Sequence, residues 1–521
     1  MRGRRNTGGL AFLLVVFAGG ALDSPARAGL PPPYGGRVVL GQLGHLSLVS
    51  PREAETFAEL LLVRQLHETM VRVYADGRLV PVMLERPPEP ADSGREWILK
   101  LRPGLVDQAG ATITATDVVA SWQRLLSSRG DSPHWWLLAV IEGATDFHAG
   151  RAVKVRGLEV VNRLQLRVRL RVALPEFPQV LAAVPLAPLS TRFRTSGKPG
   201  PLPGSGPFLL QTVLPGQDQV KLAPFPRHCL GRPLLDLLEW KAYENEGTAR
   251  LDMKLRRLDG LLDRDFPGQD LTVQKSAVGW PIMLVVNDKK LDELPEGFLP
   301  VLERLLDRES LVRYAVGGWG NVMEGFLESA VGQPSPGGEA TPEEVSDFSR
   351  HLALQKGGTP PVLVFLVRRG APVERRIAER IQVGLLKAGI VVSLLEQDSR
   401  QLRRKCRAGD YHLVLARPFI PCRDESLRLL GMLAAIHWLT GSDSLVKMME
   451  DLLARMAQLK PDQQRRAVVR ELARAYQRRL PVVPLLFQEH GLSRGQGLAN
   501  LRLLLSGLVD LAEAWQVGVT E

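Results

Sequence analysis

The sequence contains few of the residues that build metal centres, disulfide frameworks or membrane spans. Its 521 residues include three cysteines, Cys229, Cys406 and Cys422, without a Cys-x-x-Cys pair, and nine scattered histidines. No metal-ligand spacing results, and we expect neither a metal site nor a cofactor. Two arrangements of the cysteines stay open: one disulfide, with Cys406 and Cys422 as the favoured pair, or three separate buried thiols.

Long apolar runs are missing after residue 28, so no later segment is expected to cross a bilayer. Residues 1–28 themselves have the pattern of an export signal. Arg2, Arg4 and Arg5 precede the apolar run Leu10–Ala18, and Ala26-Arg27-Ala28 fits a small-x-small cleavage site. No cysteine follows the apolar run, which excludes the usual lipid-anchor signal. We therefore expect a soluble periplasmic or secreted chain, cleaved near Ala28, without a lipid anchor.

Aromatic residues make up 6% of the chain and basic clusters are short. The whole chain has 67 basic and 56 acidic residues. Removal of the signal leaves 63 basic and 55 acidic residues, which gives a formal charge of +8. The basic runs are Arg375-Arg376, Arg403-Arg404-Lys405, Arg465-Arg466 and Arg478-Arg479. Aromatics do not interleave with them, as a nucleic-acid surface would need. The pattern favours solvated helix faces, and we expect no nucleic-acid partner.

A strand, a polar turn and a helix are predicted between Trp97 and Arg124. Trp97–Arg102 alternates bulky and polar residues, and Pro103-Gly104 ends the strand. Thr114 then offers a hydroxyl cap with Asp117 three residues on, before a core-facing apolar stripe. A second unit is predicted from the apolar run Val362–Val367, a helix begun by Pro372 and ended by Gly389, and a further strand. It is a βαβ unit with parallel strands.

These stretches resemble, in order, the extracellular solute-binding proteins of bacterial ABC transporters, family 5, the peptide and nickel binders. The resemblance rests on Trp-x-x-x-Leu-Arg-x-Gly from Trp97, Thr-Ala-x-Asp-Val-Val-x-Ser-x-x-Arg from Thr114, Gly204-Ser205-Gly206-Pro207-Phe208, and Ala388-Gly389-Ile390 after Ile381-Gln382. Two departures are Gln108-Ala109-Gly110, where the family has an Asp-Gly turn, and Leu299, where the family has an arginine.

The resemblance implies an α/β fold of the class II periplasmic-binding type. It has two lobes with mixed sheets joined by crossover strands, plus an extra N-terminal subdomain. The expected division is a signal peptide at 1–28, a lobe I core at 29–65, 200–280 and 488–521, an extra lobe I subdomain at 66–199, and lobe II at 281–487. A Gly/Pro-rich linker at 197–207 and passages near Asn287 and 485–490 would carry the chain between these parts.

The resemblance also implies a function: an extracytoplasmic solute-binding protein that captures a peptide or peptide-like solute between its lobes and delivers it to a membrane permease as a monomer. The alternative is a diverged member that binds an opine, a sugar or a metal chelate, or that acts as a sensor. The residues expected to face the ligand are Glu55, Phe57, Tyr243, Asn245, Trp319, Phe419 and Asp424.

One ligand-defining stretch departs from the resembled pattern, Trp-x-Ala-Asp-Tyr-x-Asp. Here the chain reads Pro418-Phe419-Ile420-Pro421-Cys422-Arg423-Asp424, so that Pro421 occupies the place of the amine-binding aspartate. Two prolines remove two backbone donors. We therefore expect weak binding of ordinary short peptides.

Enzyme function is not expected. Gly491-Leu492-Ser493-Arg494-Gly495 matches the letters of a nucleophile elbow, but no histidine follows residue 490 to complete a triad. Glu68 is interpreted as a structural acid because neither a partner carboxylate nor a nucleophile motif accompanies it.

Overall fold

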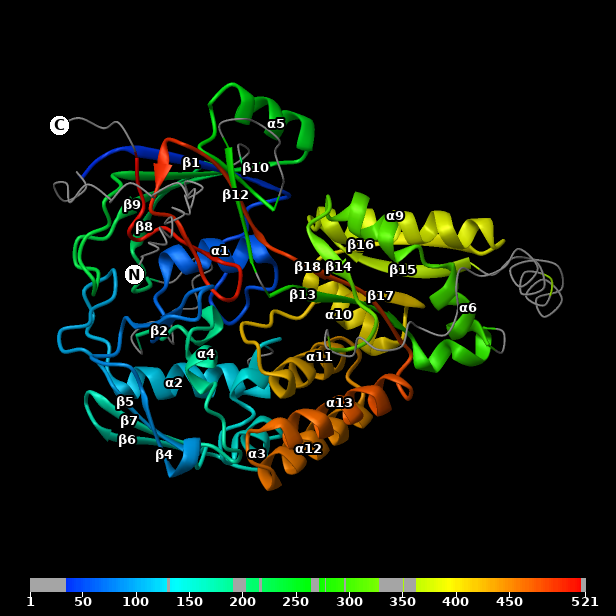
Figure 1. Cartoon of the computed structure of the whole chain (residues 1–521), viewed down its shortest axis with the longest axis horizontal. Coiled ribbons are helices and arrows are strands. Elements are labelled where there is room, and N and C mark those ends of the chain that lie inside the picture. Colours follow the sequence, from blue (N-terminus) through cyan, green and yellow to red (C-terminus); the bar gives the residue numbers. More distant parts are fainter. Residues whose placement is uncertain are drawn as a thin grey trace, which may run out of the picture.

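Three main sheets organise the chain (Figure 1). The computed structural model describes residues 34–128, 132–190, 203–214, 218–263, 271–276, 278–294, 297–327, 350 and 362–516. The predicted export signal and its cleavage site lie outside these residues, as does most of the 197–207 linker.

The first sheet has seven strands in the order β12-β19-β11-β1-β10-β9-β8. The central strand β1 is parallel to β10 and β11, and the outer pairings are antiparallel. Helix α5 packs on one face over Val39 and Leu261, and α1 packs against β8. The elements are β1 (Arg37–Leu43), α1 (Phe57–Leu66), β8 (Phe208–Leu214), β9 (Gln219–Pro224), β10 (Leu237–Tyr243), α5 (Glu246–Lys254), β11 (Gly260–Leu262), β12 (Leu271–Lys275) and β19 (Gly491–Gly495).

A four-stranded antiparallel sheet, β4-β5-β7-β6, lies in the predicted extra subdomain, with α2 packed against β6. The capping box of Thr114 and Asp117 at α2 is confirmed, and β2 and β3 pair as an antiparallel hairpin. The elements are β2 (Val71–Val73), β3 (Leu79–Pro81), β4 (Glu89–Ala91), η1 (Asp92–Gly94), β5 (Glu96–Lys100), α2 (Ala115–Leu126), η3 (Trp135–Leu138), α3 (Ala144–His148), β6 (Leu158–Asn162), β7 (Gln165–Arg169), α4 (Phe177–Leu181) and η4 (Val184–Leu186).

The third sheet has six strands in the order β14-β18-β13-β17-β15-β16. The predicted βαβ unit is confirmed, because β15 runs parallel to β16 with α9 between them. Helices α9 and α6 and segment η7 lie on one face, and α10 and α11 lie on the other. The elements are β13 (Trp280–Val286), η6 (Asp288–Glu293), α6 (Phe298–Leu305), α7 (Arg308–Ser310), η7 (Leu311–Ala315), β14 (Gly320–Val322), β15 (Val362–Arg368), α9 (Pro372–Lys387), β16 (Val391–Gln397), α10 (Ser399–Ala408), β17 (Leu413–Ala416) and β18 (Val482–Gln488).

Three helices follow β17 and reach the extra subdomain (Figure 1), where the first of them contacts η3 and Glu450 of the second lies 2.9 Å from Arg171. They are α11 (Glu425–Thr440), α12 (Asp443–Gln458) and α13 (Gln463–Gln477). Helix α11 is apolar on all sides, as expected of a helix buried all round. One face meets α12 and α13, and another meets η3, where Gly431 lies against the ring of Trp136. A single apolar cluster therefore joins the two lobes.

The chain passes between the first and third sheets twice within the described residues. The first passage lies between Lys275 and Trp280, earlier than the predicted one at Asn287, whose side chain instead caps η6. The second runs from the end of β18 at Gln488 to the start of β19 at Gly491. Four short strands, β20 (Leu498–Ala499), β21 (Arg502–Leu503), β22 (Val509–Asp510) and β23 (Trp515–Gln516), complete the chain.

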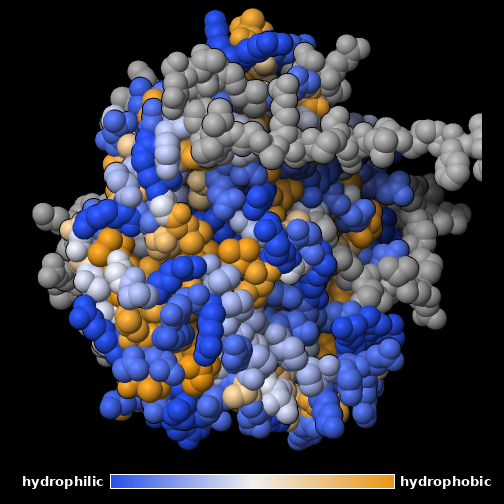
Figure 2. Space-filling view, turned by 60° about the vertical axis from the view of Figure 1, so that its left-hand side comes forward, coloured by the Kyte–Doolittle hydropathy of each residue, from blue (hydrophilic) through white to orange (hydrophobic). Residues whose placement is uncertain are grey.

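Hydrophobic residues on the face drawn in Figure 2 form patches that hydrophilic residues interrupt. None of the helices in the described part of the chain is long and apolar enough to span a membrane. The proposed lobe boundaries follow the sheets along the sequence, and we keep them as a proposal.

Candidate functional site

Two small chambers lie between the first and third sheets and share Arg417. Chamber one is lined by Glu55, Pro133, His134, Trp136, Arg368, Arg417, Pro418, Phe419, Ala435, Trp438 and Leu439. Chamber two is lined by Gln42, Leu43, His45, Thr56, Phe57, Ala58, Leu262, Asp263, Gly370, Ala371, Pro372, Val373, Arg417 and Gln488. Each draws residues from both lobes, and together we call them the cleft.

The chambers measure about 30 and 80 Å³. On this measure one water needs ~10–15 Å³, whereas pockets for drug-sized ligands reach ~300–1,000 Å³. Neither chamber as it stands has room for a drug-sized solute, so such a solute enters only if the lobes separate or the lining side chains move.

Two arginines reach the cleft from neighbouring parallel strands. Arg368 is the last residue of β15, and Arg417 follows β17 directly. Because the carboxyl ends of parallel strands lie at one edge of a sheet, both guanidinium groups meet at that edge, where α/β proteins commonly hold ligands. Arginine also suits this place chemically, since its planar fork binds carboxylate and phosphate groups in bidentate fashion.

An ion pair crosses the cleft from one lobe to the other. Glu55, in the turn before α1, lies 3.2 Å from Nη2 of Arg368. Glu374 of α9 lies 3.9 Å from Arg368 and 3.5 Å from Arg417. Nη2 of Arg417 donates to Oε1 of Gln488 at 2.8 Å. The two cations are thus oriented by protein partners before any solute arrives.

Burial shifts the protonation of these groups. Desolvation raises the pKa of Glu55 to about 7, although Arg368 acts in the opposite direction. Desolvation also lowers the pKa of Arg417, and the charge of Arg368 contributes to this. For Arg368, burial alone would lower the pKa, but Glu374 and Glu55 raise it above its usual value. The pair of arginines therefore favours an added anion, most of all when Glu55 is neutral.

Aromatic rings form the wall between the two chambers. The ring of Phe57 stacks on His490 with centroids 4.1 Å apart, and Trp280 meets Phe57, Phe419 and His490 edge-on. Asp263 accepts from Nδ1 of His490 at 2.8 Å. The cleft thus combines a cationic edge with apolar ring faces, which suits a solute that has an anionic group and an apolar part.

Three of the seven predicted ligand residues, Glu55, Phe57 and Phe419, line the chambers. The other four have local roles. The hydroxyl of Tyr243 donates to Asp252, Asn245 caps α5, Trp319 is buried beside Lys275, and Asp424 caps α11 by accepting from the Leu427 amide. Of the predicted segment 418–424, Pro418 and Phe419 reach chamber one.

Sequence reasoning missed the residues that give the cleft its charge, above all Arg368 and Arg417. A signal existed, because each follows an apolar strand, and a cation there is unusual unless it is paired. His134 and Trp136 had no comparable signal. Their place depends on η3 packing against α11, which no local pattern predicts.

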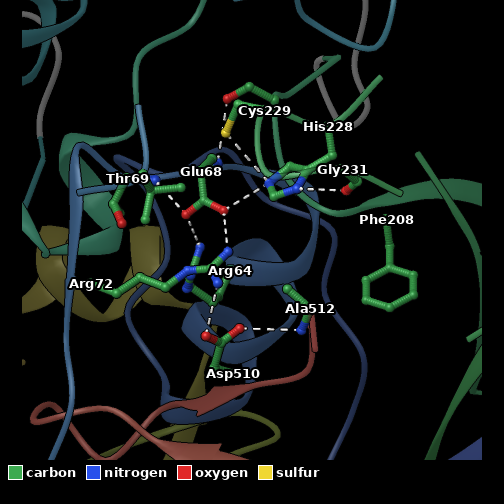
Figure 3. A network of polar contacts seen from close by, with 12 residues as sticks. Arg64, Glu68, Thr69, Arg72, Phe208, His228, Cys229, Gly231, Asp510 and Ala512 are labelled. Carbon is green, nitrogen blue, oxygen red and sulfur yellow. Dashed lines mark hydrogen bonds and ion pairs between the residues drawn. The ribbon is translucent and has the colours of Figure 1, made fainter. Parts of the chain in front are cut away.

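Glu68, interpreted as a structural acid, is the centre of a buried ionic network (Figure 3). Its carboxylate lies 2.5 Å from Arg64, 2.6 Å from Arg72 and 3.0 Å from Nε2 of His228. Arg72 also pairs with Asp510 at 3.0 Å. Burial raises the pKa of Glu68, but Arg64 and Arg72 outweigh it and hold this pKa well below its usual range.

Cys229 lies 3.8 Å from His228 in the same network, yet the geometry is not that of an activated thiol. One nitrogen, Nε2 of His228, faces both Glu68 and Cys229, so the carboxylate does not orient the ring from the opposite side. Burial raises the pKa of the Cys229 thiol to about 12. All three cysteines are free thiols, which excludes the Cys406–Cys422 disulfide in this structure.

Ser493 has no elbow geometry, because Gly491–Gly495 is strand β19, paired with β11 and β12. Within the described ranges, no group of three or more His, Cys, Asp or Glu side chains could hold a metal ion.

Comparison with known proteins gives consistent relatives. Residues 78–421 match the sequence profile of the bacterial extracellular solute-binding proteins, family 5. The periplasmic murein peptide-binding protein MppA of Escherichia coli is 23% identical over 421 residues, covering 75% of this chain and 76% of that protein. The probable deoxycholate-binding periplasmic protein YgiS of Escherichia coli is 31% identical over 174 residues, 32% of each chain. The structure of Listeria monocytogenes OppA bound to peptide superposes with a TM-score of 0.77 at 15% identity, covering 93% of this chain and 99% of that one.

Proposed function

Because this chain belongs to the bacterial extracellular solute-binding proteins, family 5, we propose that it is the extracytoplasmic solute-binding protein of an ABC importer. It captures a peptide or peptide-like solute in the cleft between its lobes. The relatives are binding proteins, named as periplasmic in both Escherichia coli examples. We extend this to the finer features: export with cleavage near Ala28, no lipid anchor, a monomer in solution, and delivery to an inner-membrane permease.

The observation that carries the proposal is the cationic edge of the cleft, Arg368 and Arg417, tied to the opposite lobe by Glu55. A solute carboxylate could replace the carboxylate of Glu55 on Arg368 as the lobes close. Binding would then exchange one ion pair for another within the same buried space, which limits the desolvation cost of enclosing a charge.

A second candidate is a non-peptide solute, such as an opine, a sugar, a metal chelate or an amphipathic carboxylate. Pro418, which lacks an amide donor, lines chamber one, and Pro421, which lacks one too, is buried. One carboxylate oxygen of Asp424 accepts from the Leu427 amide in the cap of α11, and Asp424 lines neither chamber. The partial match to a probable deoxycholate-binding protein is in line with an anionic, apolar solute.

Catalysis is not part of the proposal. The relatives are binding proteins, and Ser493 lies within a strand. Replacing Ser493 by Ala should leave any measured turnover unchanged, and turnover that disappears on this change alone would contradict the binding-protein assignment.

The test is a thermal-shift screen of the mature protein against di- to pentapeptides, opines, sugars, nickel chelates and bile acids. A hit is then titrated against Arg368→Gln and Arg417→Gln. Each variant should weaken binding about ten- to a hundredfold, because a hydrogen bond to a charged group contributes ~1.5–3 kcal/mol. Arg380→Gln, an exposed arginine of α9, is the matched control and should bind as the wild type does.

Two outcomes would contradict parts of the proposal. Stabilisation by many unrelated peptides at micromolar concentration would refute the expected weakness toward ordinary peptides. A hit that binds Arg368→Gln and Arg417→Gln with unchanged affinity would show that the solute does not occupy the cationic edge.

A further inference from the structure

Helix α10 carries an unusual row of cations. Its ten residues include Arg400, Arg403, Arg404, Lys405 and Arg407. Arg400 and Arg404 are four residues apart, as are Arg403 and Arg407, so like charges face one another along the helix. Arg400 also lies in the first turn, where the helix dipole disfavours a cation. The arrangement destabilises the helix itself, which suggests that these side chains interact with something outside the helix.

Two acidic residues flank α10 at its ends. Asp398 caps α10 by accepting from the Gln401 amide, and Asp410 follows its last turn. Within the described part of the chain, Arg400 and Arg404 are exposed and form no ion pair. They line a solvent-open groove with Arg403 and Arg407, to which Gln401 and the carboxylate of Asp398 also contribute.

The row lies beside chamber one. The guanidinium of Arg403 sits 4.7 Å from the ring centroid of Trp438, and Nη2 of Arg407 donates to the Trp438 carbonyl at 3.4 Å. Trp438 lines chamber one together with Glu55 and Arg368. The charge of Arg403 also lowers the pKa of Glu55, which places it within electrostatic reach of the inner site.

We propose that the α10 arginines form an outer anion site at the mouth of the cleft, which binds a second anionic group of the solute. This inference rests on the proposed solute-binding function and names its class: a solute with at least two anionic groups, of phosphate or carboxylate type. Arg400 and Arg407 are seven residues apart, which is ~10 Å along a helix. The row therefore spans a diphosphate or a pair of carboxylates, and guanidinium groups bind both.

The outer site also attracts the solute before it is enclosed. Exposed like charges beside a cleft raise the local concentration of an opposite charge and speed its association, and salt screens this effect. Removing the row should therefore lower the association rate more than it raises the dissociation rate, and the difference should shrink at high ionic strength.

The experiment titrates the mature protein with inorganic pyrophosphate by calorimetry at low salt. Arg400→Gln/Arg404→Gln is compared with Arg375→Gln/Arg380→Gln, which removes the same charge from exposed positions of α9 in the same lobe. The α10 variant should lose at least about tenfold in affinity, and the α9 variant should stay within about twofold of the wild type. Equal melting temperatures confirm that both variants fold.

Arg368→Gln separates this inference from the proposed function. It should weaken the solute found in the screen but keep pyrophosphate binding within about twofold. Failure to find any solute, with pyrophosphate still lost only in the α10 variant, counts against the proposed function and supports the outer site. Absence of pyrophosphate binding to the wild type, or equal weakening by the α10 and α9 variants, overturns the outer site.

Discussion

Replacing Glu68 by Gln should destabilise the protein by about 3–5 kcal/mol, because breaking a buried ion pair leaves its partners uncompensated. The side chains of Glu68, Arg64, Arg72 and His228 are at most 2% exposed. A glutamine keeps the shape of Glu68 but turns an amide donor toward guanidinium donors. Arg72 would keep Asp510, whereas Arg64 would lose its only carboxylate partner in the network of Figure 3.

The assay is urea unfolding, followed by tryptophan fluorescence and by circular dichroism. Glu85→Gln is the matched control: Glu85 pairs with Lys100 at 2.7 Å, but both side chains are about half exposed. The control should leave the free energy of unfolding close to that of the wild type, because solvent screens an exposed ion pair. His228→Gln, which alters only one contact of the carboxylate, serves if Glu68→Gln does not fold.

The pH dependence of the same variant gives a second check. The pKa of Glu68 is held well below its usual range in the folded protein. Its contribution is therefore present above the unfolded pKa of ~4.3 and lost as pH falls through the folded value. The gap between wild type and Glu68→Gln should be full at pH 7 and shrink below about pH 4. A gap under ~1 kcal/mol at pH 7 would refute the network as a stabilising element.

Three further predictions concern the cleft and the interface between the lobes. The pKa of Glu55 is raised to about 7, so folding takes up a proton. The wild type should therefore lose stability relative to Glu55→Gln as pH rises from 5 to 8, and parallel melting curves would contradict this. Gly431→Ala should cost ~1–3 kcal/mol, because a Cβ there would lie 2.9 Å from the Trp136 ring. Gly384→Ala on α9, whose Cβ would meet only Leu305 O at 3.5 Å, should be neutral or stabilising in the same melt. Trp319→Phe should keep the full fluorescence change that accompanies closure of the lobes on a ligand, because Trp319 is buried outside both chambers. Loss of this fluorescence change would show that Trp319 belongs to the ligand site.

Local patterns in the sequence were sufficient to predict many of the helices and strands. Thr114 and Asp117 predict the start of α2, because both hydrogen bonds of a capping box form within four residues. The apolar spacing after Phe57 predicts α1. The stripe Leu445, Met448, Met449, Leu452, Leu453 and Met456 predicts the inner face of α12, and all of these residues except the half-buried Met448 are buried. The βαβ unit from Val362 follows from strand, helix and strand in close succession.

Several predicted site residues proved to have local partners instead. Asp424 was expected to face the ligand, and its carboxylate instead accepts from the Leu427 amide as the N-cap of α11, which begins at the next residue. Asn245, also expected to face the ligand, is likewise a cap, and so is Asn287, near which a passage between the lobes was expected; their amide oxygens accept from helix N-termini. Polar residues at the ends of helices and strands cap helices as readily as they bind ligands. The sequence alone does not distinguish these two roles.

The sequence by itself determined the elements, their order and the family, because capping, turn residues and apolar periodicity act over a few residues. Tertiary structure alone decided which charges meet. Tyr74 bonds Asp510 across 436 positions, Glu68 bonds His228 across 160, and Glu55 meets Arg368 from the other lobe. The physical reason is that a buried charge is tolerable only beside a partner, and that partner is selected by how the sheets and helices pack, at sequence distances over which no local pattern extends.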